Sequence, residues 1–303
     1  MKSRFLLFSL MLALVFPPAV LSRASETWYD DVPENHEYYT AISAMTEAGV
    51  VSGYEDNTFR AMDEVNRVEA LKMILEATGH NKDDAGTDTA PFDDMDSNAW
   101  YVPYVNYAYQ EEILSGDEAG TLRPESSVNR VEALKMLILA ADKTSELPGV
   151  SNDTWYSSYL AYATENALLV PDANGDYTPQ ATLSRGELSE LIYRFQNHPY
   201  TGEVEFGDAT YYGYSYDGVN TASGTPLEAY GYMAAHKTLP FGTQVRVTNV
   251  NNNQSVIVTI VDRGPYGAGR IVDLTPAAFE TLGSLSAGVL DVRLEVLADT
   301  TTL

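Results

Sequence analysis

The spacing of apolar residues changes once along this chain, close to residue 200. Between residues 28 and 196 they recur at helical intervals, so that Leu71, Ile74 and Leu75 fall on one face of a helix. From residue 203 onward they alternate with polar residues, which is the period of a β-strand. We therefore expect a helical half followed by a mainly β half.

The helical half repeats itself. The octapeptide NRVEALKM occurs at 66–73 and again, 63 positions later, at 129–136, and a looser copy, SRGEL, begins at Ser184. Each copy follows an aromatic start and an apolar segment that ends in a turn. A period of this length indicates one helix–loop–helix unit used three times. The expected units are residues 27–80, 91–142 and 153–196.

The octapeptide has the features of a helix start. Asn66 suits the N-cap and Glu69 stands at N3, which is the reciprocal capping-box pattern, and the other two copies follow it. The intervening residues, Arg67, Arg130 and Arg185, place a cation at a helix N-terminus and so oppose the macrodipole. Because an arginine stands at this unfavourable position three times, we expect the arginines to bind an anionic ligand. The alternative is that the repeats are purely structural.

The β half is expected to form a small barrel. Gln244–Asn249 would turn Val245 and Val247 inward, and Ser255–Val261 is nearly all β-branched, as a buried strand should be. Further on, Val292, Leu294 and Val296 alternate with Asp291, Arg293 and Glu295, which predicts the final strand. Several short strands and one helix are typical of a barrel of about 100 residues, here residues 203–303.

The single helix of the β half has clear end signals. Thr275 suits its N-cap, Pro276 its first position and Gly283 the position after its end. The stretch Asn197–Gly202 (NHPYTG) contains helix breakers and is expected to be a linker between the two halves.

The N-terminus predicts the compartment. Lys2 and Arg4 precede an apolar run, 5–16, and small residues at 22–24 follow a Pro pair. The run is shorter than the roughly 20 residues that cross a bilayer. This favours a cleaved signal peptide, residues 1–24, over an uncleaved anchor helix. We expect an exported protein of the cell envelope or surface, with no membrane insertion after signal cleavage.

The amino-acid composition excludes several classes of partner and site. A formal charge of -25 excludes a nucleic-acid partner, because little basic surface is left to neutralise phosphates. The absence of cysteine excludes disulfides, thiolate metal sites and a cysteine nucleophile. No histidine or acid has metal-ligand spacing, so neither a metal nor a cofactor is expected. The 21 tyrosines suit stacking on sugars or ordinary packing.

The repeats resemble S-layer homology domains, whose hallmarks are an aromatic-Asp start, a G-x-x-D-G-T-F-like turn and a T-R-A-E box. The resemblance implies helical repeats around a pseudo-threefold axis, with grooves that bind anionic secondary cell-wall polysaccharide or another envelope polymer. The box arginines, Arg67, Arg130 and Arg185, would be the groove residues. The third unit departs from the pattern, with Ser184 and Gly186 in its box and no G-x-x-D-G turn, so its groove is expected to be the least typical.

Five motifs of the β half occur in the order typical of the rare lipoprotein A family, which they resemble: GDATYYG, TASGT, AAHKTLPFGT, VTIVDRGPY and RIVDL. The resemblance implies a double-psi β-barrel, the fold of expansins and some lytic transglycosylases. It also implies cleavage of peptidoglycan glycan strands to 1,6-anhydromuramic ends without hydrolysis. The expected catalytic residues are Asp262 and His236. The expected substrate-binding residues are Thr210, Tyr212, Thr221, Arg263 and Asp273.

Alternatives remain open for the three main site residues. Asp262 follows an apolar strand, where partial burial would favour a proton-donating form, and one carboxyl can serve as acid and then base. It could instead cap a turn. Asp273 suits either glycan hydroxyls or the cap of the following helix, and His236 suits either hydrogen bonding to substrate or Asp262, or an ordinary core position.

One departure bears on activity. Active-type family members carry a glutamate directly after T-A-S-G, whereas this chain has Thr225, which cannot act as a general acid. Glu228 is the nearest replacement carboxylate. The preferred hypothesis is a wall-anchored lytic transglycosylase-like protein. The alternatives are a non-catalytic, expansin-like glycan-binding module and a purely structural envelope protein.

Overall fold

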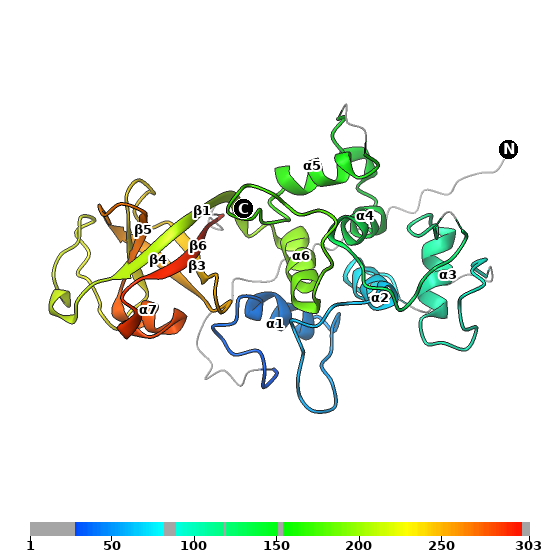
Figure 1. Cartoon of the computed structure of the whole chain (residues 1–303), viewed down its shortest axis with the longest axis horizontal. Coiled ribbons are helices and arrows are strands. Elements are labelled where there is room, and N and C mark those ends of the chain that lie inside the picture. Colours follow the sequence, from blue (N-terminus) through cyan, green and yellow to red (C-terminus); the bar gives the residue numbers. More distant parts are fainter. Residues whose placement is uncertain (1–27, 82–88, 118, 151–153, 299–303) are drawn as a thin grey trace.

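The computed structural model describes residues 28–81, 89–117, 119–150 and 154–298. The expected signal peptide, residues 1–24, lies outside this part of the chain. Figure 1 shows the helical repeats at one end of the long axis and a β-barrel at the other. Within the described residues, no helix combines the length and the apolar character needed to cross a membrane.

Each repeat contributes two helices. In chain order they are α1 (Tyr39–Glu47) and α2 (Arg67–Ala77), α3 (Val102–Gln110) and α4 (Arg130–Ala140), and α5 (Ser157–Glu165) and α6 (Arg185–Asn197). All three predicted capping boxes are confirmed. In α2, for example, Asn66 Oδ1 accepts the Glu69 N–H at 2.9 Å while the Glu69 carboxylate accepts the Asn66 N–H.

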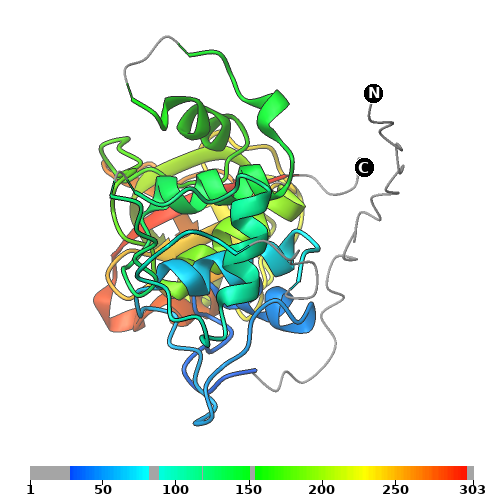
Figure 2. The same ribbon diagram turned by 90° about the vertical axis from the view of Figure 1, so that its right-hand side faces the viewer.

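A ring of backbone hydrogen bonds closes the three repeats on one another. Val65 N–H donates to Leu183 at 3.1 Å, Leu183 to Val128 at 3.0 Å, and Val128 back to Val65 at 3.1 Å. The three side chains are buried in one hydrophobic core. The first helix of each repeat packs on the second helix of the preceding one, as α3 does on α2 and α1 does on α6. This confirms the expected pseudo-threefold arrangement, which Figure 2 shows in front of the barrel.

The departure at Gly186 has a packing cause. A Cβ at this position would lie 2.2 Å from the ring of Tyr38, which comes from the first repeat. The other two boxes carry Val68 and Val131 at the equivalent position. Glycine in the third box therefore makes room for an aromatic ring of the first repeat.

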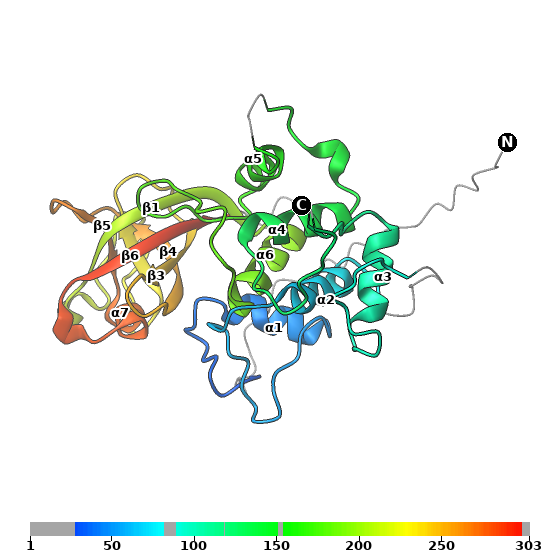
Figure 3. The ribbon, with the colours of Figure 1, turned by 45° about the vertical axis from the view of Figure 1, so that its right-hand side comes forward.

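The β half is a closed barrel of six strands, as expected. Its spatial order is β1-β5-β2-β4-β3-β6, in which β1 pairs in parallel with β5, β2 pairs in parallel with β4, and the other pairs are antiparallel. The closed order agrees with a double-psi barrel. Figure 3 shows β1 and β6 running from the repeats along the barrel wall. The strands are β1 (Tyr200–Tyr211), β2 (Met233–His236), β3 (Gln244–Asn249), β4 (Ser255–Asp262), β5 (Arg270–Leu274) and β6 (Leu290–Leu297).

The barrel has its own apolar core, separate from that of the repeats. Val245 and Val247 point inward, as the alternation predicts, and the predicted helix α7 (Pro276–Leu282) contributes Phe279 and Leu282. Thr275 precedes α7 but makes no side-chain cap. Its hydroxyl instead donates to the Gly231 carbonyl at 2.6 Å.

The expected linker is shorter than predicted. α6 continues to Asn197, His198 adopts the left-handed conformation (φ 44°, ψ 49°), and β1 already begins at Tyr200. The Pro199 carbonyl accepts the Ala298 N–H at 2.9 Å, so Pro199 is already tied to the barrel. The breaker composition therefore marks a sharp helix-to-strand turn, and no spacer separates the two halves.

Candidate active site

Strand pairing places four residues in one row across the barrel wall. Thr210 of β1 is paired with Asp273 of β5, Asp273 with Ala235 of β2, and Ala235 with Asp262 of β4. Directly paired residues project from the same face of a sheet. Their chain neighbours Ala209, Val272 and Ala234 belong to the barrel core. The row therefore faces away from the core and carries a carboxyl group on each side of a small alanine.

Asp262 accepts three hydrogen bonds. The N–H groups of Ala222 and Arg263 donate to Oδ1, each at 2.8 Å, and the Tyr212 hydroxyl donates to Oδ2 at 2.8 Å. These three donors fix the orientation of the Asp262 carboxyl group. A carboxylate offers about four acceptor positions, so one position on Oδ2 remains for a hydroxyl of a ligand.

Tyr212 is held as the donor in this contact. Burial raises the pKa of its hydroxyl far above the usual value, and the hydrogen bond to Asp262 raises it further. The phenol therefore keeps its proton at any physiological pH. It orients the carboxylate of Asp262 and cannot act as a base.

Asp273, the second carboxyl group of the row, is partly buried. Burial raises its pKa, and the charge of Asp262 raises it further, whereas the Thr210 hydrogen bond and Arg270 lower it. Thr210 Oγ1 donates to Asp273 Oδ1 at 2.8 Å. The first turn of α7 receives no described cap from Asp273, so the structure gives no support to the capping alternative. A carboxyl group whose pKa is raised, next to a second carboxyl group, is a candidate proton donor.

The TASGT turn closes over Asp262. Thr221 Oγ1 donates to the Thr225 carbonyl at 2.8 Å, and the Ser223 N–H donates to the Val261 carbonyl at 3.1 Å. These bonds place Thr225, an exposed residue, on the turn whose Ala222 N–H holds Asp262. Glu228 is also exposed, and no described hydrogen bond ties it to Asp262 or Asp273.

His236 lies on the inner face of the barrel wall and is only 2% exposed. Its Nδ1 accepts the Leu239 N–H at 3.0 Å, which places the proton of a neutral ring on Nε2, 3.3 Å from the Glu205 carboxylate. Asp262 is not among its described hydrogen-bond partners, contrary to one of the two functional expectations. The alternation along β2 explains this, because His236 follows Ala235 and so points the other way.

Arg263, at the end of β4, contacts the segment that follows β2. Its Nη1 donates to the Leu239 carbonyl at 2.9 Å and to the His236 carbonyl at 3.3 Å. Its guanidinium lies 3.8 Å from the centre of the Phe241 ring. Arg263 therefore holds the segment after β2 against the end of β4, and its role toward a substrate stays a prediction.

Several exposed tyrosines lie in loops of the barrel domain, and the sequence analysis did not single them out. The Tyr216 ring lies 5.9 Å from that of Tyr212, and the rings of Tyr214 and Tyr230 lie 5.6 Å apart. Tyr230 is 78% exposed. Glu205, the partner of His236, was also missed, because it lies outside every motif. For the tyrosines, clustering in glycine-containing loops was the available signal.

The box arginines of the repeats lie between neighbouring repeats. Arg67 lies 3.4 Å from Glu132, and Arg130 lies 2.7 Å from Glu187. For these two arginines, the capping glutamate of the next repeat therefore compensates the cation that opposes the dipole of its own helix. Arg185 donates to the carbonyls of Phe59 and Ser52, and no carboxylate lies within ion-pair distance of it among the described residues.

A groove of about 230 Å³ opens beside Arg185. Lys72 of α2 and Trp100 of the second repeat also line it, and Trp100 is 54% exposed. The arginine of the least typical box thus lines an open groove. Within the described residues, no group of three or more histidine, aspartate or glutamate side chains is arranged to hold a metal ion.

Family models match both halves. The S-layer homology domain model matches residues 29–71, 91–134 and 150–189, and the lytic transglycolase model matches residues 204–294. The endolytic peptidoglycan transglycosylase RlpA of Vibrio cholerae is 38% identical over 130 residues, which cover 42% of this chain and 49% of that protein. A probable RlpA of Treponema pallidum is 50% identical over 91 residues, covering 30% and 29%.

This chain therefore spans about half the length of its curated relatives, or less. Among solved structures, it is similar to a Streptomyces papain inhibitor (27% identity, TM-score 0.28, 32% of this chain and 96% of that one). It is also similar to an expansin from Clavibacter michiganensis (23% identity, TM-score 0.28, covering 33% and 52%). Residues 29–189 are thus three S-layer homology repeats, and residues 204–294 are an RlpA-like barrel domain of the lytic transglycolase family.

Proposed function

We propose that the barrel cleaves the glycan strands of peptidoglycan and leaves 1,6-anhydromuramic ends. The observation that carries this proposal is the pair of carboxyls in one row, with Asp262 held by three donors and the pKa of Asp273 raised by burial. The RlpA relatives are named endolytic peptidoglycan transglycosylases, and their similarity to the barrel supports a reaction on peptidoglycan.

In the proposed reaction the two carboxyls divide the proton transfers. Protonated Asp273 gives its proton to the glycosidic oxygen as the bond from that oxygen to the anomeric carbon breaks. Asp262 accepts the proton of the muramic 6-hydroxyl, whose oxygen forms the new bond to the same carbon. No water is consumed, and Asp262 can then pass its proton on to solvent or to Asp273. Thr210 and Tyr212 orient the carboxyls, and His236 supports the wall behind them.

The second candidate is a glycan-binding module without catalysis. Two features favour it. Exposed Thr225 stands where the family resemblance implies a glutamate, and the exposed ring of Tyr216 lies against that of Tyr212, which binds Asp262. Aromatic rings bind sugar faces through their apolar surface and leave polar groups free. A barrel that only binds would need these rings and would not need a protonated Asp273.

For the repeats we propose attachment to an anionic polymer of the cell envelope. The groove beside Arg185 supports this, because two cations, Arg185 and Lys72, and an exposed indole ring line it together with a single carboxylate, Glu69. The family of the repeats and the RlpA relatives indicate association with the cell envelope or wall. We thus propose two binding sites on one chain: the repeats bind the polymer, and the barrel binds peptidoglycan.

The deciding experiment uses the full chain and purified glycan strands, with mass spectrometry of the products. The catalytic proposal requires 1,6-anhydromuramic ends from the natural chain and their loss in Asp273→Asn and Asp262→Asn. A co-sedimentation assay on the same samples shows whether the variants still bind the strands. Binding without anhydro products in the natural chain would establish the second candidate instead.

A further inference from the structure

Because the three repeats are equivalent, the residues at matching positions can be compared. At two of these positions, one groove carries a different type of residue from the other two. The residue six places after the box start is Lys72, Lys135 or Glu190, and the residue before the N-cap of each first helix is Glu37, Trp100 or Trp155. The spacing between equivalent residues is 63 and then 55 in both sets. Each groove takes the first position from one repeat and the second from the next.

Two grooves carry the lysine and the tryptophan together. The Arg185 groove holds Lys72 and Trp100. At the equivalent position between the second and third repeats, which the threefold order assigns to Arg67, the Lys135 ammonium lies 5.6 Å from the centre of the Trp155 ring. Both tryptophans are more than half exposed. These two grooves are therefore alike in chemistry, as the threefold arrangement requires.

The Arg130 groove differs at both positions. Glu190 replaces the lysine and Glu37 replaces the tryptophan, and both side chains are buried, at 6% and 5% exposure. Arg130 itself resembles Arg185, since it donates to the Tyr177 carbonyl just as Arg185 donates to that of Phe59. The lysine and tryptophan positions have thus changed, whereas this contact of the arginine is kept.

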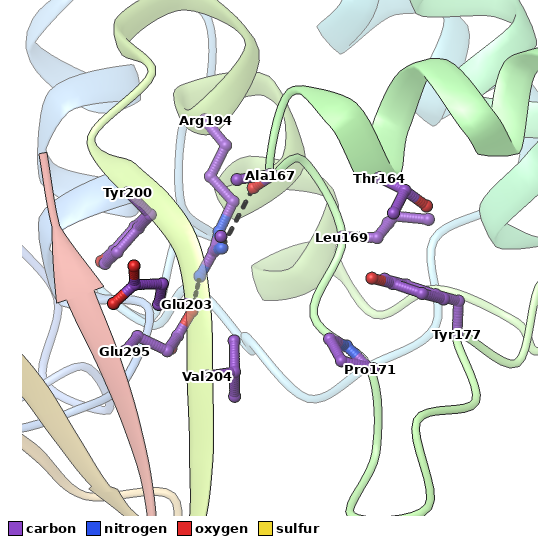
Figure 4. Close-up of a pocket in the computed structure, with 11 residues that line it drawn as sticks. Thr164, Ala167, Leu169, Pro171, Tyr177, Arg194, Tyr200, Glu203, Val204 and Glu295 are labelled. Carbon is purple, nitrogen blue, oxygen red and sulfur yellow. Dashed lines mark hydrogen bonds and ion pairs between the residues drawn. The ribbon is translucent and has the colours of Figure 1, made fainter.

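The barrel fills this groove. The open groove is lined by Val51 and Gly53, whose equivalents in the third repeat are Leu169 and Pro171. In the Arg130 groove these equivalents face Tyr200 and Val204 of β1. The space left between them is about 20 Å³, against about 230 Å³ in the Arg185 groove. Figure 4 shows Arg194 reaching between Glu295 of the barrel and the Ala167 carbonyl. A space this small holds about one water molecule.

The two replacement glutamates bind arginines of the barrel. Glu190 accepts from Arg246 of β3 at 2.9 Å, and Glu37 accepts from Arg293 of β6 at 3.1 Å. Glu295 completes the cluster by pairing with all three arginines, which are Arg194, Arg246 and Arg293. Three arginines and three glutamates thus balance in charge. Removing one partner from a buried pair is strongly destabilising, because it leaves an uncompensated charge.

Backbone contacts extend the interface to the first repeat. The Glu37 N–H donates to the Asn253 carbonyl at 2.9 Å, and the Ser255 N–H donates to the Asn35 carbonyl at 2.6 Å. Asn35 Nδ2 also donates to the Thr281 carbonyl at 2.9 Å. The segment before α1 is therefore attached to the β3–β4 turn and to α7.

We propose that the Arg130 groove is the socket of the barrel: it takes no envelope polymer, and it joins repeats and barrel into one rigid body. Two grooves, beside Arg185 and Arg67, then remain for the polymer. The number of polymer sites rests on the proposed attachment function, whereas the socket does not.

The socket is tested by restoring the repeat residues with Glu190→Lys and Glu37→Trp in the full chain. Each change puts a side chain natural to the other grooves against the barrel arginines. We expect protease cleavage between Pro199 and Val204 to become about 100-fold faster or more, with helical circular dichroism retained. The matched control, Lys135→Glu in an open groove, should leave the cleavage rate unchanged. A double variant as resistant as the natural chain would overturn the proposal.

A second measurement leaves the socket intact. The chain has no cysteine, so Met62→Cys and Val289→Cys, both at exposed positions, allow two spin labels to be placed on repeats and barrel alone. One rigid body predicts a single narrow distance distribution by double electron–electron resonance. A broad distribution, as a flexible tether gives, would show that the socket does not hold the barrel.

The number of polymer sites is tested by sedimentation with wall fragments that retain their attached polymers. Trp100→Ala and Trp155→Ala should each weaken binding, and the double variant should lose at least 90% of it. Substantial binding by the double variant would show that a further site exists. A natural chain that does not bind these fragments would refute the attachment function, while protease and spin-label results decide the socket independently.

Discussion

The box arginines of the repeats and the carboxyls of the barrel are both charged groups at motif positions, yet their surroundings differ. Arg67 and Arg130 are each paired with a glutamate of the next repeat. Asp262, by contrast, keeps an open acceptor position although three donors hold it. A charged motif residue is thus available to a ligand only where the surrounding fold leaves part of its bonding capacity unused.

The largest expected effect concerns the barrel carboxyls. If the proposed division of roles holds, Asp273→Asn removes the proton donor and should lower the rate of anhydro-product formation by about 10³-fold or more. Asp262→Asn should have an effect of similar size, because it removes the acceptor. The rates are measured by mass spectrometry under single-turnover conditions with the full chain.

The control for these variants is Asp208→Asn, in the same barrel but outside the row of paired residues. It should retain activity within about threefold, since surface changes away from a site have small effects. Equal losses in all three variants would mean that general destabilisation, and not acid–base chemistry, explains the result.

The second effect distinguishes structural from ligand-facing residues in the repeats. Arg130→Ala should lower the free energy of unfolding by about 2 kcal/mol, because it leaves Glu187 partly buried without its partner. Trp100→Ala should change stability by no more than about 0.5 kcal/mol and should weaken wall binding. Urea unfolding and wall sedimentation on both variants separate the two roles; the reverse pattern would contradict them.

A smaller effect is expected at the TASGT turn. Thr225→Glu would add a carboxylate on the turn that holds Asp262, and we expect product formation to rise about tenfold, at the low end of general acid–base effects. Thr225→Gln is the matched control, with the same size and no ionisable group. A gain shared by both variants would assign the effect to shape, and no gain in either would separate this chain from its relatives at that position.

The smallest expected effect is on the pH dependence of folding stability, through Asp273. Because burial raises the pKa of Asp273, folding favours its protonated form. Its contribution is full below the unfolded pKa of about 3.9 and is lost as pH rises through the folded value. Asp273→Asn should therefore melt slightly higher than the natural chain at pH 7, with the difference shrinking toward pH 4. A lower melting temperature at pH 7 would show that the carboxylate stabilises the fold.

The sequence predicted most of the architecture because that architecture follows from local rules. The capping boxes, the inward valines of β3 and the limits of α7 depend on residues close together in the chain. The face on which His236 lies could not be predicted, since strand alternation assigns sides only once the register is known. Its partner Glu205 lies in a strand that no motif marked.

The socket was missed for a related reason. The alternation along β6 was recognised, and Val292 and Leu294 lie in the barrel core, but the opposite face, with Arg293 and Glu295, would ordinarily face solvent. Strand periodicity distinguishes two faces and does not show that both are buried. A signal was nevertheless present, because Glu190 interrupts an otherwise repeated lysine.

The direct passage from α6 into β1 also determines how mechanical force would pass through the molecule. Tension between a held envelope polymer and a bound glycan strand would enter the barrel along the axis of β1. That strand is hydrogen-bonded to β5 on one side and to β6 on the other. Pulling along it loads many parallel hydrogen bonds in shear at once, and so the strand that bears Thr210 is also the one best placed to resist extension.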